Sequence, residues 1–97
     1  MAVAVFISWE GMTSDQYETA RQVVNWEGDP PSGLLLHVSA FGDQGLQVTD
    51  IWESAEDFQA FVQSRLMPGM AQMGVSSQPE TLVREIHALF TPGFQRV

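Results

Sequence analysis

The sequence predicts an α+β fold whose elements follow in the order βαββαβ, with the strands in one antiparallel sheet. Three observations predict it: an apolar extended segment at residues 1–9, two amphipathic segments that each follow a capping residue, Thr13 and Ser54, and two apolar runs joined by a short turn. With 97 residues and 44% hydrophobic content, the chain has enough apolar material for one core and too little for two. A single domain over residues 1–97 is therefore expected.

The first element is expected to be an inner strand. Side chains alternate between the two faces of an extended chain, and here both faces are largely apolar, with Val3, Val5, Ile7 and Trp9 on one and Ala4, Phe6 and Ser8 on the other. Such a segment needs cover on both sides. It is too short for a membrane span and lacks the basic start of a secretory signal.

A helix is expected over residues 14–27. Thr13 is placed as its N-cap, Gln16 as the partner in a capping box, and Met12 and Tyr17 as a hydrophobic staple. The apolar positions within the segment fall at helical spacing, which predicts one buried face. The glycines and prolines at 28–33 then end the helix.

Residues 34–41 and 46–52 are apolar, and the short turn between them contains Asp43 and two glycines, so an antiparallel hairpin is expected. Ser54 then caps a second helix with Asp57 at the third position. The buried stripe of that helix is Phe58, Phe61, Val62 and Leu66.

The second helix is expected to stop at Met67-Pro68-Gly69, because proline cannot donate its backbone nitrogen to a continuing helix. A polar loop follows at residues 75–80, and the last strand is expected over residues 81–90. The resulting order is that of ferredoxin-like domains, in which both helices cover one face of the sheet and the other face stays bare. An apolar bare face predicts a homodimer that packs two such faces together.

Residues 48–54, Val-Thr-Asp-Ile-Trp-Glu-Ser, followed by Phe58 and Phe61, resemble the end of the third strand and the start of the capped helix in the dimeric α+β barrel superfamily. The chain looks most like its antibiotic-biosynthesis-monooxygenase-like and stress-responsive barrel members. The resemblance implies a dimeric α+β barrel and a small-molecule site between sheet and helices. It leaves open cofactor-independent oxygenation, isomerisation, cyclisation or no catalysis.

Two branches of that superfamily carry a histidine that this chain lacks. The haem ligand of the haem-degrading branch falls near Ala71, and the histidine segment of the polyketide-cyclase branch is matched by Met67-Pro68-Gly69-Met70. The resemblance therefore carries over neither mechanism, and no cofactor is expected.

The charge and composition of the chain exclude several classes of partner. Four arginines and no lysine stand against twelve acidic residues, a net charge of −8, so neither nucleic acid nor a membrane surface is an expected partner. No cysteine is present, which excludes disulfides and thiolate chemistry. A cytoplasmic location is expected.

Three polar side chains in otherwise apolar strands are candidates for proton transfer: Asp50, His37 and His87. Asp50 shares a strand face with Val48 and Trp52, the face expected to look towards the helices, and an ionisable group enclosed there is suited to general acid–base catalysis. The alternatives are structural. Asp50 could pair with Arg84 or lie exposed at the strand end, and the histidines could be hydrogen-bonded at a dimer seam or on the sheet surface.

Large apolar side chains are candidates to bind a hydrophobic or aromatic small molecule: Trp9, Tyr17, Trp52, Phe61 and Met70. Met67, Met70 and Met73 could form an adaptable lid or a simple core cover. No metal site is expected, because the two histidines are fifty residues apart and no short ligand spacing is present.

The leading hypothesis is a small-molecule enzyme with Asp50 or His37 as base and His87 as a second polar group. The alternative is a non-catalytic ligand-binding or interaction dimer whose pocket is filled by its own side chains. A cavity of about 300 Å³ or more would favour the enzyme, and a solidly packed interface would favour the alternative.

Overall fold

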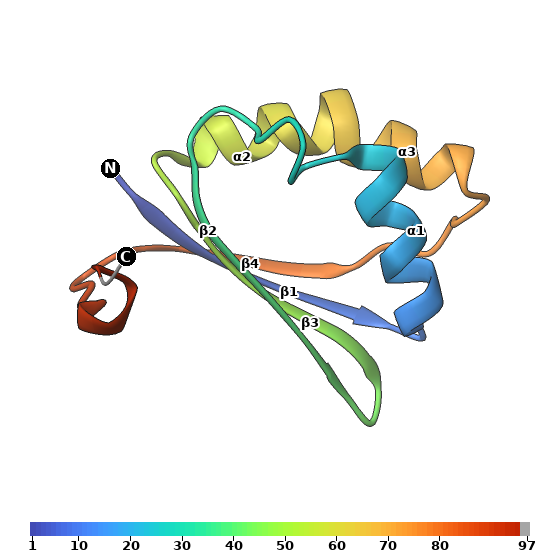
Figure 1. Cartoon of the computed structure of the whole chain (residues 1–97), viewed down its shortest axis with the longest axis horizontal. Coiled ribbons are helices and arrows are strands. Elements are labelled where there is room, and N and C mark those ends of the chain that lie inside the picture. Colours follow the sequence, from blue (N-terminus) through green and yellow to red (C-terminus); the bar gives the residue numbers. More distant parts are fainter. Residues whose placement is uncertain (96–97) are drawn as a thin grey trace.

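The computed structural model describes residues 1–95, and of Gln95 only the backbone. Its elements follow the chain as β1 Val3–Glu10, α1 Ser14–Val24, β2 Leu34–Gly42, β3 Gly45–Trp52, α2 Ala55–Phe61, a π-helical turn η1 Val62–Leu66, α3 Met67–Gln72, β4 Glu80–Glu85 and a 3₁₀ turn η2 Pro92–Gln95. The strands form one antiparallel sheet in the order β2-β3-β1-β4 (Figure 1). The predicted ferredoxin-like α+β fold is confirmed, with β1 in the interior of the sheet.

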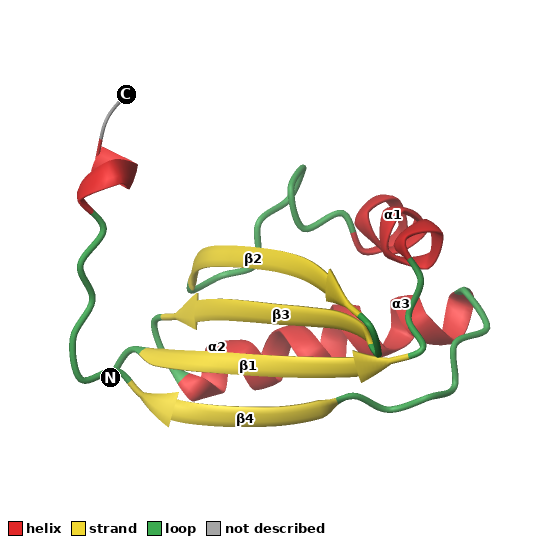
Figure 2. Ribbon diagram, turned by 90° about the horizontal axis from the view of Figure 1, so that it is seen from below, coloured by secondary structure: helices red, strands yellow, loops and turns green. Residues whose placement is uncertain are grey.

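The helices lie on one side of the sheet, and Figure 2 views the opposite face, on which none of the described helices packs. The core fills the space between the two layers, where Val5, Trp52 and Met70 are the largest fully buried side chains. None of the helices in residues 1–95 is long and apolar enough to cross a membrane.

The start of α1 is as predicted, and its end is not. Thr13 accepts from the Gln16 backbone nitrogen at 3.1 Å, and the Gln16 side chain accepts from the Thr13 nitrogen at 2.9 Å, which completes the capping box. The helix ends at Val24 rather than at 27, because Asn25 adopts the left-handed conformation with φ 59°. Trp26 therefore lies in the connection to β2.

The predicted break at Pro68 is wrong, because the helical path from Ala55 continues to Gln72. Ser54 caps α2 as predicted, its hydroxyl accepting from the Asp57 nitrogen at 3.1 Å. The chain widens into the π-turn η1 just before the proline, and the Met67 nitrogen bonds back to the Val62 carbonyl. The wider turn accommodates a residue that has no backbone N–H to donate.

The last strand is shorter than predicted, ending at Glu85 rather than at 90. The chain then runs away from the sheet past the N-terminus to η2 (Figures 1 and 2). Its large apolar side chains Leu89, Phe90 and Phe94 are all exposed. His87 lies in this exposed segment, outside the sheet.

The bare face of the sheet carries exposed apolar side chains. Phe6 of β1, Val38 of β2 and Leu82 of β4 are 43%, 47% and 54% exposed. The next residues along β1, Val5 and Ile7, are buried against the helices. Alternation along the strands therefore leaves apolar groups on both faces, as the sequence indicates.

Candidate functional site

A hollow opens between the sheet and the helices, on the side of α1 and β2. Its cavity volume is about 60 Å³, and the hollow measures about 620 Å³ when its open mouth and the adjoining solvent are counted. The wall is largely apolar and is formed by Ile7, Trp9, Met12, Tyr17, Ala20, Trp26, Leu34, His37, Leu46, Val48, Asp50, Trp52, Phe58, Phe61, Leu66 and Met70. No lysine or arginine in the described part of the chain, residues 1–95, contributes to it.

The polar part of the wall begins with a cross-strand pair. His37 on β2 lies directly opposite Asp50 on β3, and His37 Nδ1 is 2.7 Å from Asp50 Oδ1. Asp50 is only 5% exposed, and its other oxygen, Oδ2, accepts the indole N–H of the fully buried Trp52 at 3.1 Å. The carboxylate thus has a partner on each oxygen, which offsets much of the cost of burying it.

A β-bulge places Leu34 on the same wall of the hollow as His37. Leu34 is paired with Trp52 and Leu36 with Ile51, so Leu35 is an extra residue in β2. In a regular strand Leu34 and His37 would lie on opposite faces, because they are three residues apart. The extra residue shifts the alternation by one position, and both side chains line the hollow.

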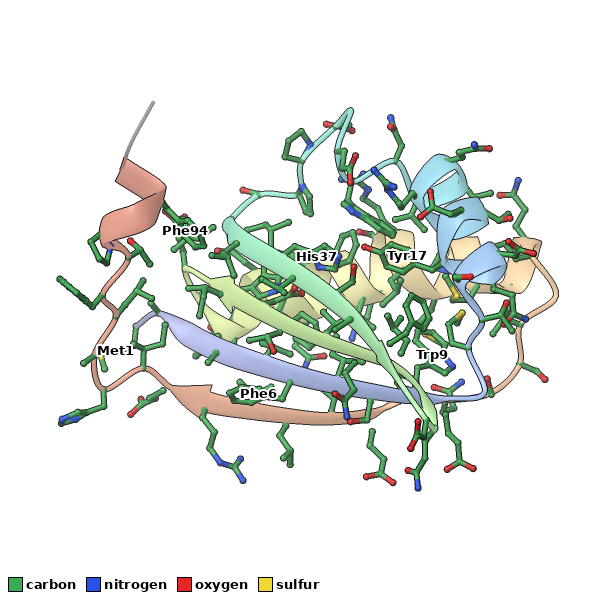
Figure 3. All side chains as sticks on the ribbon, turned by 60° about the horizontal axis from the view of Figure 1, so that its bottom comes forward. Met1, Phe6, Trp9, Tyr17, His37 and Phe94 are labelled. Atoms are coloured by element: carbon green, nitrogen blue, oxygen red, sulfur yellow. The ribbon has the colours of Figure 1, made fainter. Side chains whose placement is uncertain are left out.

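Tyr17 of α1 completes a chain of hydrogen bonds. Its hydroxyl is 2.8 Å from His37 Nε2, and the two rings are stacked with centroids 6.2 Å apart. Figure 3 shows the two labelled side chains close together between β2 and α1. The order is Tyr17, His37, Asp50, Trp52, running from the helix into the sheet.

The donors and acceptors in this chain assign the tautomer of His37. An ionised Asp50 can only accept, so His37 Nδ1 carries the hydrogen that it donates to Oδ1. A neutral His37 then has its lone pair on Nε2, which accepts the Tyr17 O–H. Burial raises the pKa of Tyr17 above 10.0, so the phenol keeps its proton at neutral pH. When His37 is neutral, its Nε2 lone pair is therefore the one that faces Tyr17.

The structure brings most of the predicted site residues together. Two of the three candidates for proton transfer, His37 and Asp50, and all five candidates for ligand contact, Trp9, Tyr17, Trp52, Phe61 and Met70, line the one hollow. His87 is not among them and lies exposed beyond β4. Arg84 does not pair with Asp50, since its guanidinium donates to the Val83 carbonyl.

Of the wall residues that the sequence analysis did not single out, Trp26 is the one with a hydrogen-bonding side chain. The helix expected over residues 14–27 contains it, and its position after a left-handed Asn25 carries no marker of function. Its ring lies 5.6 Å from Tyr17 and 5.4 Å from His37, measured between centroids. Among the described residues no three histidine or acidic side chains cluster in a way that could hold a metal ion.

Comparison with solved structures shows the fold of this chain in other proteins. A protein of unknown function from Nitrosomonas europaea is 20% identical with a TM-score of 0.68, and 94% of each chain is covered. SnoaB, a cofactor-independent oxygenase from Streptomyces nogalater, is 11% identical with a TM-score of 0.64 and coverage of 91% and 94%.

A provisionally assigned antibiotic biosynthesis monooxygenase from Deinococcus radiodurans is 10% identical, with a TM-score of 0.61 and coverage of 93% and 96%. These likenesses show the antibiotic-biosynthesis-monooxygenase-like fold that residues 48–54 indicate. No protein-family model and no curated protein matches the sequence.

Proposed function

We propose that the chain is a small-molecule enzyme in which His37 is the general base, Asp50 orients it, and Tyr17 carries the proton between the substrate and His37. The observation that carries the proposal is the unbroken hydrogen-bond chain from Tyr17 to Asp50 in the wall of an apolar hollow. A carboxylate that fixes one imidazole nitrogen and leaves the other as an acceptor is the arrangement that activates histidine as a base.

The chemical step is a proton transfer. As the substrate loses an acidic C–H or O–H proton to the Tyr17 oxygen, the Tyr17 proton passes to His37 Nε2, and Asp50 stabilises the imidazolium that forms. The electron pair of the broken bond stays on the substrate as an enolate or phenolate. Oxygenation, isomerisation and cyclisation of an aromatic compound can each start from such an anion, and the likeness in fold to a cofactor-independent oxygenase is consistent with the first.

The wall indicates a neutral, hydrophobic substrate. The described wall residues include no lysine or arginine, so a carboxylate or phosphate on the substrate would be buried against them without a counter-charge. Aromatic side chains form much of the remaining wall, which suits a planar ring system.

One observation favours the non-catalytic alternative. The cavity volume of about 60 Å³ is well below the roughly 300 Å³ of ordinary ligand sites, and below the roughly 150 Å³ of a cavity that holds benzene. Even a single-ring substrate must therefore displace side chains such as Met70, whose flexible thioether adapts readily. In the alternative function, the hydrogen-bond chain only satisfies polar groups inside a filled core.

Deuterium exchange separates the two functions. 2-Indanone is small, neutral and aromatic, and its acidic C–H bonds exchange in D₂O once a base removes the proton. The wild-type protein should accelerate this exchange, and His37→Gln should lower the acceleration by about 100-fold or more. Tyr17→Phe should lower it as well, while His87→Gln, which alters the other histidine, should leave it unchanged. Equal exchange with wild type and His37→Gln would remove the enzyme proposal.

We also propose that a second copy of the chain covers the bare sheet face. Phe6, Val38 and Leu82 form an apolar surface there, and an exposed face of this kind favours association. Light scattering should give twice the chain mass of 10.8 kDa, and Phe6→Glu should shift the protein towards monomer. A wild-type monomer at micromolar concentration would contradict this proposal.

A further inference from the structure

The wall of the hollow contains one hydrogen-bond donor that no described residue uses. Trp26 is 9% exposed, and its indole Nε1 is buried without a partner in residues 1–95. The other two tryptophans of the wall are satisfied, Trp9 by the Ser77 hydroxyl at 2.9 Å and Trp52 by Asp50. An unpaired buried N–H is destabilising, so its retention calls for an explanation.

Trp26 lies beside the proposed base. Its ring is tilted against both Tyr17 and His37, with centroid separations of 5.6 Å and 5.4 Å. A molecule that approaches Tyr17 from the hollow therefore comes within reach of Trp26 as well.

The backbone around Trp26 is held in place from two sides. The guanidinium of Arg65 donates to the carbonyls of Val24 at 2.8 Å and Asn25 at 3.1 Å. The Asp29 nitrogen also donates to the Asn25 carbonyl, at 3.0 Å. The indole is thus presented by a fixed turn, and a donor fixed in advance stabilises developing charge without a reorganisation cost.

We propose that the Trp26 indole N–H is a catalytic hydrogen-bond donor that binds an acceptor oxygen of the ligand. The inference rests on the proposed function and adds a second polar contact to it. When the C–H next to a ligand carbonyl gives its proton through Tyr17 to His37, the electron pair moves onto the carbonyl oxygen, which Trp26 then stabilises as an enolate. Ligands that carry such an oxygen are selected over the same ring without it.

Two probes and two variants test the donor. 2-Indanone and indane share one ring system and differ by the ketone oxygen, and their dissociation constants are measured by calorimetry or by NMR titration. Trp26→Phe removes the N–H and keeps an aromatic ring, while the control Phe90→Leu changes an exposed aromatic side chain outside the hollow. The preference for 2-indanone over indane should fall about fivefold in Trp26→Phe, the worth of one net hydrogen bond, and should be kept in Phe90→Leu.

A second measurement does not depend on the folding of a variant. In the wild-type protein the three tryptophan indole protons give separate ¹H–¹⁵N resonances, and the Trp26 proton should move downfield with 2-indanone and not with indane. An unchanged preference in Trp26→Phe, an unmoved Trp26 proton, or failure of both probes to bind would overturn the inference. If the ligand preference and the Trp26 proton shift show no effect of Trp26 while deuterium exchange of 2-indanone still depends on His37, the donor is refuted and the base is not. If exchange does not depend on His37 while both Trp26 effects are seen, the base is refuted and the donor is not.

Discussion

Replacing Asp50 tests the hydrogen-bond chain, because two substitutions at this position should differ in how much stability they remove. Asp50→Ala leaves the Trp52 indole N–H and the His37 Nδ1–H without acceptors. An unsatisfied buried donor costs about 1–3 kcal/mol, and Trp52 is fully buried while the His37 side chain is 23% exposed. Taking the full range for Trp52 and the low end for His37, Asp50→Ala should lower the free energy of unfolding by about 2–4 kcal/mol.

Asp50→Asn should cost much less stability and still remove the base. The amide oxygen can accept from Trp52, and the amide nitrogen can donate to His37 Nδ1. His37 must then change tautomer, so that its hydrogen moves to Nε2 and the nitrogen facing Tyr17 loses its lone pair. The expected result is a loss of about 1 kcal/mol together with loss of His37-dependent proton exchange.

Urea unfolding measures the stabilities, and long-range ¹H–¹⁵N spectra of the imidazoles report the tautomers. The exposed His87 is an internal reference in the same spectra, and Asp43→Ala in the exposed turn is the matched aspartate control, with an expected change within about 0.5 kcal/mol. A stability of Asp50→Ala equal to that of Asp43→Ala, or an Nε2–H tautomer of His37 in the wild type, would refute the assigned chain.

Three further perturbations test the fold around the site. Tyr17 is the only tyrosine, so tyrosinate absorbance reports its pKa directly, and the midpoint should lie above 10.0. The stabilisation that comes from its raised pKa should be fully present below pH 10.0 and should be lost as the pH rises through the pKa of the folded state. A midpoint at or below 10.0 would contradict the burial of the phenol. Ser54→Ala should cost about 1 kcal/mol of unfolding free energy through the lost cap, and an unchanged denaturant midpoint would show that the cap contributes nothing. Gly33→Ala should cost about 1–2 kcal/mol, because φ is +87° and the added Cβ meets the Asp57 carboxylate; Gly93→Ala, where a Cβ meets nothing, is its control.

Sequence patterns predicted the elements that are governed by local chemistry. Capping residues act on backbone nitrogens three positions away, so Thr13 and Ser54 located both helix starts. Strand alternation placed Asp50 with Trp52 on the face that meets the helices, and both line the hollow. Proline was less informative, since the π-turn before Pro68 lets the helical path continue.

The candidate site depends on what the sequence determines and on what only the tertiary structure decides. The sequence by itself determined which side chains are available: two histidines, an acid in an apolar strand, several large aromatic side chains, and no lysine or cysteine. Only the tertiary structure decided which of them meet. The register of the β2–β3 hairpin places His37 opposite Asp50, the bulge at Leu35 brings Leu34 to the same wall, and the early end of β4 leaves His87 outside. Register, bulges and strand ends are set by pairing across the sheet, which the alternation of a single strand does not encode.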